Sequence, residues 1–291
     1  MSAVEGQQSR HRSAEDEGRA ANTIPYTISV IIPTKNEEEN VAPLIGRIAR
    51  ALNPVTTELI FADDSDDRTA AVIEAKRATA ACRIELIHRP PEKRRGGLGG
   101  AVVEAMSVAR ARWVCVMDGD LQHPPELITE LVATAEASGA AVVIASRHTS
   151  DAGMDGFGLG RTLLSGAAAR AARLAFPRRL RPVSDPMSGF FLVRRNAIDL
   201  GALRPRGFKI LIEILARHPD LRVAEVPFVF GARYLGETKA SLREGFVYGL
   251  QLLRLRAAAF RPGGPRFSGR AVTRLQEFPT PPIDEESLCG S

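Results

Sequence analysis

The chain has 291 residues, of which 44% are hydrophobic and 25% charged, and its formal net charge of +5 corresponds to a sequence pI of about 9.4. This length allows one large α/β domain or two small ones, and the basic balance suits a phosphate-bearing partner: nucleic acid, an anionic membrane or a phosphorylated small molecule. The three cysteines are too few and too far apart for a disulfide framework or a zinc site, and the amino-terminal residues lack the apolar core of a signal peptide, so we expect a cytoplasmic protein.

The two ends of the chain are predicted to be disordered tails. Residues 1–24 are rich in Glu, Gln, Arg and Ser, and residues 261–291 are rich in Pro and Gly. Between them we expect one domain over residues 25–241 and an amphipathic helix over residues 242–260. Charged residues interrupt the apolar residues of that helix, so it does not predict a membrane span. A helix at the membrane interface and a helix that packs on the core both remain open.

Short apolar runs alternate along the domain with segments of helical periodicity. In the first such segment, apolar residues at positions 41, 44, 45, 48 and 52 fall on one helix face. This alternation predicts an α/β fold with a mostly parallel sheet and helices on both faces. The predicted strands are residues 28–32, 58–62, 84–88, 113–117 and 141–145, and the predicted helices are residues 38–52, 67–79, 99–109 and 125–138.

Polar clusters follow three of these strands directly. Residues 33–37 follow the first strand, residues 63–67 the second, and residues 118–122 the fourth. Because the carboxyl ends of parallel strands meet at one edge of a sheet, and ligands of such sheets bind there, we expect the three loops to converge on one site.

The loop after the fourth strand has the pattern of a metal site. Asp118 and Asp120 lie two positions apart, so an extended chain points both carboxylates to the same side. Such a pair suits Mg²⁺ or Mn²⁺, which takes oxygen ligands and keeps positions open for substrate phosphates, and Gln122 adds a further oxygen. A solvated acidic turn is the ordinary alternative for an isolated motif of this kind. We do not expect His123 to be catalytic, because the two prolines after it indicate a helix start.

The loop after the second strand, Asp63-Asp64-Ser65-Asp66-Asp67, holds more carboxylates than the capping of the next helix requires. It lacks the glycine and the later glutamate of an EF-hand calcium loop. Hydrogen bonding to the base and ribose of a nucleotide is the remaining interpretation.

A glycine-rich stretch precedes the third predicted helix. Gly96, Gly97, Gly99 and Gly100 follow three basic residues and suit a phosphate cradle at a helix amino terminus. Their order differs from that of a P-loop, so a flexible loop that covers the site is an equal alternative.

Further stretches complete a set of motifs in fixed order. The set consists of Ile31-Ile32-Pro33-Thr34-Lys35-Asn36-Glu37, the acidic run from Ala62 to Asp67, Gly97-Leu98-Gly99, the run from Asp118 to Glu126, Ser146-Arg147, Asp185-Pro186-Met187-Ser188-Gly189-Phe190-Phe191, Gly207-Phe208-Lys209-Ile210-Leu211, Phe230-Gly231-Ala232-Arg233 and Gly236-Glu237-Thr238-Lys239. This set resembles family 2 of the glycosyltransferases, and within it the polyprenol- and dolichol-phosphate mannosyltransferases. The resemblance covers about residues 28–239 and implies the GT-A fold, a Rossmann-like and mostly parallel sheet.

The resemblance also implies a role for each matched site residue. The residues that would hold the nucleotide are Pro33, Glu37, Asp63 and Asp64. The residues that would hold a Mg²⁺ or Mn²⁺ ion on the donor diphosphate are Asp118, Asp120 and Gln122. The cations that would face the sugar and the acceptor phosphate are Arg147, Arg233 and Lys239. Asp185 would orient the acceptor or act as a base, although the sequence after it also suits a structural turn.

The reaction implied by this resemblance is transfer of a hexose to a polyprenyl phosphate with inversion. Mannose from GDP-mannose is the expected donor, while UDP-glucose as donor and a hydroxyl group as acceptor remain alternatives. A phosphate acceptor is already anionic at neutral pH, so it needs no strong base. Because the acceptor lies in a membrane, we expect a peripheral protein on the cytoplasmic face, with a separate membrane-anchoring subunit as a candidate partner. A nucleic-acid partner is not expected, because no nucleic-acid-binding motif is present and aromatic residues form only 5% of the chain.

Overall fold

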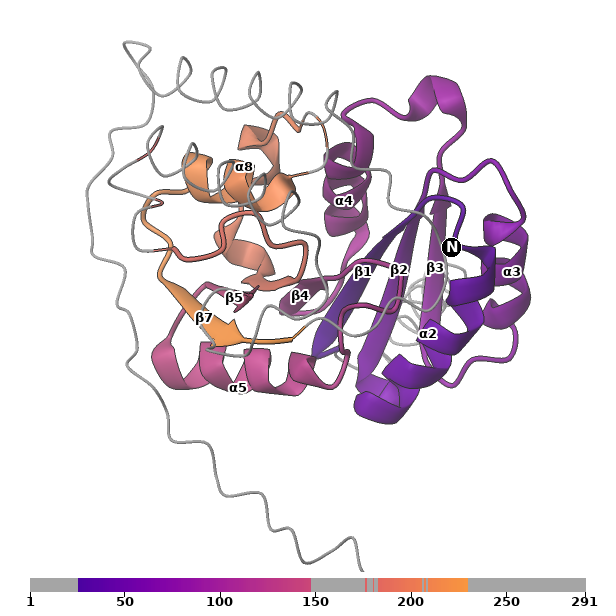
Figure 1. Cartoon of the computed structure of the whole chain (residues 1–291), viewed down its shortest axis with the longest axis horizontal. Helices are drawn as coiled ribbons and strands as arrows, with labels where there is room; N and C mark the ends of the chain where they lie inside the picture. The colour runs from indigo at the N-terminus through magenta and orange to yellow at the C-terminus, as the bar shows by residue number, and fades with distance from the viewer. Residues whose placement is uncertain are drawn as a thin grey trace, which may run out of the picture.

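The computed structural model describes residues 26–147, 183–205 and 209–229, together with residues 176, 180 and 207 (Figure 1). The predicted tails, the predicted helix over residues 242–260, and the predicted site residues Arg233 and Lys239 lie outside this part of the chain. Among the helices of the described ranges, none combines the length and the apolar character that crossing a bilayer requires.

The amino-terminal half is a series of alternating strands and helices, as the sequence predicts. Its elements are β1 Ile28–Thr34, α2 Glu38–Ala51, β2 Thr57–Asp63, α3 Thr69–Arg77, β3 Arg83–His88, α4 Gly97–Val108 and β4 Trp113–Val116, with short 3₁₀ turns at Pro54–Thr56 and Pro91–Lys93. β1 pairs with β2 and with β4, and β2 pairs with β3, in parallel register throughout. α3 begins two residues later than predicted, because the Asp67 side chain accepts the Thr69 N–H and so caps the helix from outside.

The carboxyl-terminal half extends the same sheet and adds its one antiparallel strand among the described residues. Its elements are α5 Leu127–Ser138, β5 Val142–Ser146, β6 Phe191–Arg194, α8 Ile210–Arg217 and β7 Val223–Pro227, with 3₁₀ turns at Arg195–Ala197 and Leu200–Ala202. β6 lies between β4 and β5 and runs antiparallel to both, whereas β7 is parallel to β5. The resulting seven-stranded sheet has the order β3-β2-β1-β4-β6-β5-β7. The predicted mostly parallel α/β fold is confirmed.

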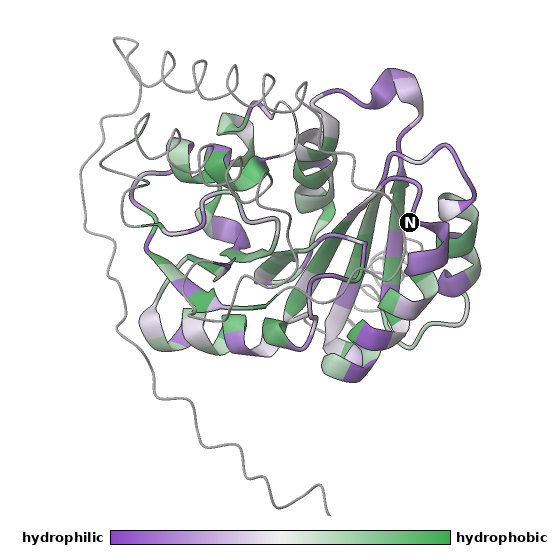
Figure 2. Ribbon diagram, in the orientation of Figure 1, coloured by the Kyte–Doolittle hydropathy of each residue, from purple (hydrophilic) through white to green (hydrophobic). Residues whose placement is uncertain are grey.

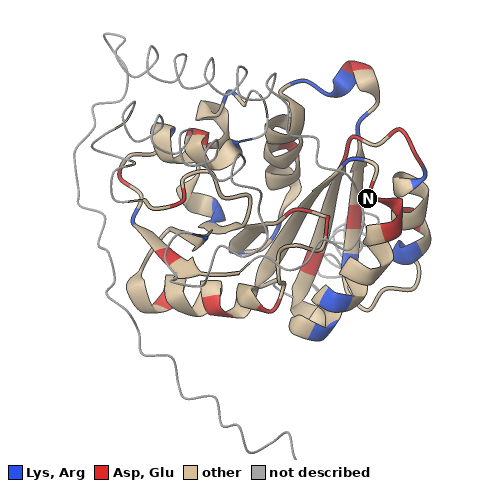
Figure 3. Cartoon of the chain, in the orientation of Figure 1, with Lys and Arg blue, Asp and Glu red and all other residues tan. Residues whose placement is uncertain are grey.

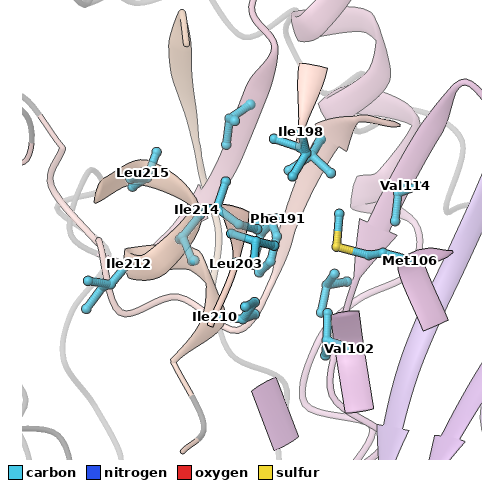
Figure 4. Packing of buried hydrophobic residues seen from close by; sticks show 14 of the residues in the cluster. Val102, Met106, Val114, Phe191, Ile198, Leu203, Ile210, Ile212, Ile214 and Leu215 are labelled. Atoms are coloured by element: carbon cyan, nitrogen blue, oxygen red, sulfur yellow. The ribbon is translucent and has the colours of Figure 1, made fainter. Parts of the chain in front are cut away.

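The hydrophobic core has two parts, one on each face of the sheet. Alternate residues of a strand point to opposite faces, so Ile31 belongs to the part under α4 and α8, whereas Ile32 belongs to the part under α2 and α5. Figure 2 shows the apolar residues concentrated on the strands and on the helix sides next to them. In the first part, Val102 and Met106 of α4 lie near Phe191 of β6 (Figure 4). Helices on both faces thus leave the ends of the strands for the functional loops.

The register of the strands brings the predicted site loops to one edge. Thr34, the last residue of β1, is the register partner of Asp63, which is in turn the partner of His88 at the end of β3. On the other side, Ser146 at the end of β5 is the partner of Pro227 at the end of β7. Figure 3 shows the acidic stretch after β2 and the basic stretch after β3 at this edge.

Candidate active site

Asp63 lies at the centre of the loops that follow β1 and β2. Its carboxylate is completely buried and accepts hydrogen bonds from the hydroxyl groups of Thr34 and Ser65. Its second oxygen lies 2.7 Å from Nδ1 of His88, whose side chain is 44% exposed. Asp63 therefore organises this loop from within. Among these side chains, that of His88 reaches solvent.

The other three carboxylates of the acidic loop also have partners inside the chain. Asp64 forms a bidentate pair with Arg89, in which Nε and one terminal nitrogen lie 2.7 and 2.6 Å from the two carboxylate oxygens. Arg94 lies 2.7 Å from Asp66, and the hydrogen bond from Arg94 holds the pKa of that carboxyl below its ordinary value. Asp67 caps α3. The loop that sequence alone presents as an acidic cluster is thus compensated by its own neighbours.

The remaining predicted nucleotide residues lie beside this loop. Asn36, with a positive φ of 57°, joins the two loops: its N–H donates to the Ser65 hydroxyl and its side-chain oxygen accepts the N–H of Asp66. The N–H of Glu37 donates to Thr69, while Pro33 is the register partner of Ala62. The structure therefore gathers Pro33, Glu37, Asp63 and Asp64 at one edge, and their contact with a nucleotide stays a prediction.

The loop after β4 differs from the acidic loop in the exposure of its first carboxylate, that of Asp118. The Asp118 side chain is 46% exposed, and within the described part of the chain its carboxylate accepts no hydrogen bond. An oxygen of Asp120 accepts the Gln122 N–H at 3.2 Å, and Leu121 between them has a positive φ of 65°. A left-handed conformation is strained for a residue with a side chain of this size, and strain of this kind clusters at functional sites.

His123 supports this loop from behind and is not exposed to the site. It is buried, stacks on Phe190 with ring centroids 5.0 Å apart, and its Nδ1 accepts the Asp118 N–H at 2.9 Å. Burial lowers the pKa of His123, an effect that the charges of Asp118 and Asp120 oppose. A neutral ring with Nδ1 as acceptor fits this arrangement.

The predicted metal ligands fit a divalent cation by the chemistry of their oxygens. Asp118 offers a half-exposed carboxylate without a hydrogen-bond donor, and Asp120 and Gln122 lie on the same short loop. The described ranges contain no group of three or more His, Cys, Asp or Glu side chains arranged around one metal position. Mg²⁺ commonly takes only one or two carboxylates from the protein and completes its shell with water and substrate phosphates, so two carboxylates suffice.

The segment Asp185–Gly189, called the 185–189 loop below, brings three charged side chains together. Asp185 is buried and pairs with Arg147, whose Nε and one terminal nitrogen lie 2.6 and 2.8 Å from its oxygens. The Met187 carbonyl accepts a hydrogen bond from Lys209 Nζ at 2.9 Å. At Gly189, an added Cβ would lie 2.9 Å from a carboxylate oxygen of Asp118. The 185–189 loop therefore lies between the predicted metal-binding carboxylate of Asp118 and the positively charged side chains of Arg147 and Lys209.

This geometry favours a positioning role for Asp185. Both of its oxygens face the guanidinium of Arg147, as expected for a carboxylate that fixes an arginine rather than for one that takes up a proton. Its role as a base stays a prediction.

The glycine-rich stretch serves close packing. The Gly99 N–H donates to the Gly207 carbonyl at 2.8 Å, and Gly96 has a φ of 80°. A Cβ on Gly96 would lie 2.9 Å from the Pro205 carbonyl, and one on Gly100 would lie 2.1 Å from that of Arg95. The amino terminus of α4 thus packs directly on the segment before α8. The Gly99 N–H is used in this packing, and the phosphate cradle and the covering loop stay predictions.

Several residues of the site were not predicted as such from the sequence. Arg89 was not singled out, Arg94 stood in a basic stretch without an assigned partner, and Lys209 stood in a recognised motif without a role. Glu225 belongs to none of the recognised motifs, although its carboxylate accepts hydrogen bonds from the N–H groups of Ser184 and Asp185. The only signal for it in the sequence is a charged residue inside an otherwise apolar strand.

The chain is similar in sequence to known glycosyltransferases. The family model described as glycosyl transferase family 2 matches residues 29–201. A dolichol-phosphate mannosyltransferase of Pyrococcus furiosus is 39% identical over 229 residues, which cover 78% of this chain and 63% of that protein. A protein of the same name from Saccharomyces cerevisiae is 34% identical over 240 residues, which cover 78% of this chain and 86% of the yeast protein. The chain thus spans less than two thirds of the length of the Pyrococcus relative.

Solved structures with a similar fold include two enzymes named as synthases of glycosylated 3-phosphoglycerates. One is glucosyl-3-phosphoglycerate synthase of Mycobacterium tuberculosis in complex with Mn²⁺, UDP and phosphoglyceric acid. The match has a TM-score of 0.60 at 22% identity and covers 86% of this chain and 82% of the synthase chain. Mannosyl-3-phosphoglycerate synthase of Rubrobacter xylanophilus has a TM-score of 0.59 at 20% identity, with coverages of 87% and 79%. At these identities the likeness shows the GT-A fold alone.

Proposed function

Because the chain belongs to glycosyl transferase family 2, we propose that it transfers mannose from GDP-mannose to a polyprenyl phosphate of the dolichyl type, with inversion at the anomeric carbon. The observation that carries the proposal is the likeness over 78% of the chain to proteins named dolichol-phosphate mannosyltransferase, at 39 and 34% identity. The placement of Arg147 and Lys209 around the loop that touches Asp118 supports it, since a phosphate acceptor requires cations beside the donor diphosphate.

In this proposal Asp118, Asp120 and Gln122 hold a Mg²⁺ or Mn²⁺ ion. When bound, such an ion supplies positive charge that stabilises the departing diphosphate. The support from this chain is the half-exposed Asp118 carboxylate, which accepts no hydrogen bond within the described residues. Pro33, Glu37, Asp63 and Asp64 line the nucleotide side in the same proposal.

The chain's own residues bring two anions together. An oxygen of the acceptor phosphate forms a bond to the anomeric carbon while the bond from that carbon to the diphosphate breaks, and the nucleoside diphosphate leaves with the electron pair. The acceptor is already ionised at neutral pH, so no residue has to take up a proton. Arg147 offers a planar set of donors suited to phosphate oxygens, and Asp185 holds it in place. Arg233 and Lys239, outside the described residues, are proposed as further phosphate contacts.

The acceptor implies contact with a membrane. We therefore place the protein, as part of this proposal, at the periphery of the cytoplasmic face, with residues 242–260 or a separate anchoring subunit as the attachment. Flotation with liposomes that contain anionic lipid, for the full chain and for a variant without residues 242–260, tests that placement. Equal flotation of both would remove residues 242–260 as the attachment, and absence of flotation for the full chain would leave attachment to a partner.

The activity itself is tested with radiolabelled donors. Purified protein, polyprenyl phosphate and Mg²⁺ are mixed with GDP-mannose or UDP-glucose, and the label is measured in an organic extract. We expect lipid-extractable label from GDP-mannose and much less from UDP-glucose. If only UDP-glucose gives lipid-extractable label, the donor is UDP-glucose and not GDP-mannose. No label from either donor would refute the proposed function.

A further inference from the structure

Glu225 anchors the turn from which the 185–189 loop begins. It lies in β7, the edge strand of the sheet, as the register partner of Ile144 in β5. Its carboxylate accepts the Ser184 N–H at 2.9 Å and the Asp185 N–H at 3.2 Å, and the Ser184 hydroxyl donates to it as well. Hydrogen bonds to a charged acceptor are about twice as strong as neutral ones. One carboxylate therefore fixes two consecutive backbone positions.

The anchored turn presents Asp185 to Arg147. Arg147 follows β5 directly, and the hydroxyl groups of Ser146 and Ser184 lie 3.2 Å apart, so the turn rests on the end of that strand. Asp185 is completely buried, whereas the Arg147 side chain is 27% exposed. A buried carboxylate pairs well only when its surroundings hold it in the right orientation. The orientation of Arg147 thus depends on a carboxylate whose own backbone is held by Glu225.

We propose that Glu225 is a positioning residue: it holds the Ser184–Asp185 turn and thereby fixes the orientation in which Arg147 meets the acceptor phosphate. This inference rests on the proposed function, and Glu225 itself touches no substrate in it. A preoriented guanidinium contributes because the cost of ordering a long, flexible side chain is met in the folded protein and not during binding.

The structure offers a matched control in Glu58. This buried glutamate also accepts a backbone N–H, that of Arg110 at 2.7 Å, and a hydroxyl, that of Ser29 at 2.6 Å. Glu58 is the second residue of β2 and lies towards the edge of the sheet opposite the site loops, whereas Glu225 lies in the middle of β7 and reaches the turn at the site edge. Glu58→Gln therefore measures how the loss of a buried carboxylate that accepts a backbone N–H affects stability when it lies away from the site.

The test is steady-state kinetics of Glu225→Ala, Glu225→Gln and Glu58→Gln with a varied acceptor and a varied donor. For Glu225→Ala we expect the acceptor KM to rise on the order of tenfold, with the donor KM unchanged, because only the acceptor-side cation loses its orientation. Glu225→Gln keeps an acceptor oxygen for the Ser184 and Asp185 N–H groups, which share Oε1, but loses the negative charge, so its acceptor KM should rise by only about threefold. Glu58→Gln should lower the melting temperature and leave both KM values unchanged.

Binding of geranyl phosphate, a short isoprenyl phosphate, measured by calorimetry gives a readout apart from turnover. If the wild type transfers sugar and binds this phosphate, but the folded Glu225 variants match it in acceptor KM and affinity, the inference is wrong. It is equally wrong if donor and acceptor KM rise together. If Glu225→Ala does not fold, Glu225→Gln decides by the same criteria. A wild type that neither transfers sugar nor binds the phosphate would instead refute the proposed function.

Discussion

Two acidic loops lie at the same edge of the sheet, and they differ in how their charge is balanced. In the loop after β2, every carboxylate has a partner: Asp63 has His88 and two hydroxyls, Asp64 has Arg89, Asp66 has Arg94, and Asp67 caps α3. In the loop after β4, the Asp118 carboxylate accepts no hydrogen bond from the described residues. The first loop is therefore balanced from within the chain, whereas the Asp118 carboxylate of the second is half exposed, with only His123 Nε2 nearby at 3.9 Å among the ion pairs of the described residues, and is open to a cation from outside.

This difference separates stability from activity. A carboxylate that is paired and buried contributes to folding, because its removal leaves a buried partner without a counter-charge. A carboxylate that is half exposed and lacks a donor contributes little to folding, and its removal affects what binds there. We therefore expect loss of the buried carboxylates Asp63 and Asp64 to lower stability as well as nucleotide binding, and loss of Asp118 to lower activity with little effect on stability.

Removal of divalent metal is expected to have the largest effect. Treatment with EDTA should reduce transfer to the background level, because the charge that stabilises the departing diphosphate is lost. The melting temperature without substrate should change little, since the Asp118 carboxylate that would hold the metal is half exposed and lies in a loop. Transfer should return when Mg²⁺ or Mn²⁺ is added. Full transfer in EDTA would contradict the metal assignment.

Asp118→Asn should follow in size. The substitution keeps the shape of the side chain but removes its charge, so we expect the transfer rate to fall by about 10²–10³-fold, as for loss of one strong electrostatic contact to a transition state. Urea unfolding should give a free energy equal to that of the wild type or slightly higher, because an uncompensated carboxylate is removed. A large loss of stability would show that this loop is balanced inside the chain after all.

Asp64→Ala tests the other loop and should act on stability. Arg89 is 3% exposed and would lose its bidentate partner, although it keeps the carbonyl groups of Arg95 and Gly97. We expect a loss of about 3 kcal/mol in the free energy of unfolding, the lower end for removal of one partner from a buried ion pair. Urea titration measures it. The double variant Asp64→Leu with Arg89→Met should recover part of the loss, and a single-variant loss below about 1 kcal/mol would contradict the buried pair.

Local sequence patterns predicted most of the fold because they reflect local physics. Apolar spacing of 3.6 or 2 residues marks which side of an element is buried, and it placed the helices and strands between residues 28 and 146 to within a few residues, whereas α8 and β7 were not predicted. The apolar run at β6 was visible too, but a run of four residues carries no information on direction. Its antiparallel pairing with β4 depends on the whole connection from β5, which no local pattern encodes.

The site was predictable where its residues are close in sequence. The spacing of Asp118, Asp120 and Gln122 pointed to a metal loop at a strand end, and the structure places these residues there. The balance of the acidic loop was not predictable, because Asp64 and Arg89 lie 25 positions apart. The same holds for Glu225 and Ser184, which lie 41 positions apart. Ion pairs and hydrogen bonds between such distant residues depend on strand order, and only the structure supplies that.

Asp66→Asn should have the smallest effect of all and tests whether compensation at an exposed position matters. The Asp66 side chain is 56% exposed, so its pair with Arg94 is screened by solvent and salt. The hydrogen bond from Arg94 lowers the pKa of Asp66 below 3.8, its ordinary value. A carboxyl with a lowered pKa in the folded state stabilises the protein above that ordinary value and loses its contribution as the pH falls through the folded-state pKa. The melting temperatures of wild type and Asp66→Asn should therefore differ slightly between pH 5 and 7 and converge well below pH 3.8. A difference that persists unchanged in acid, or that survives about 1 M salt, would show that Asp66 acts through its shape and not through its charge.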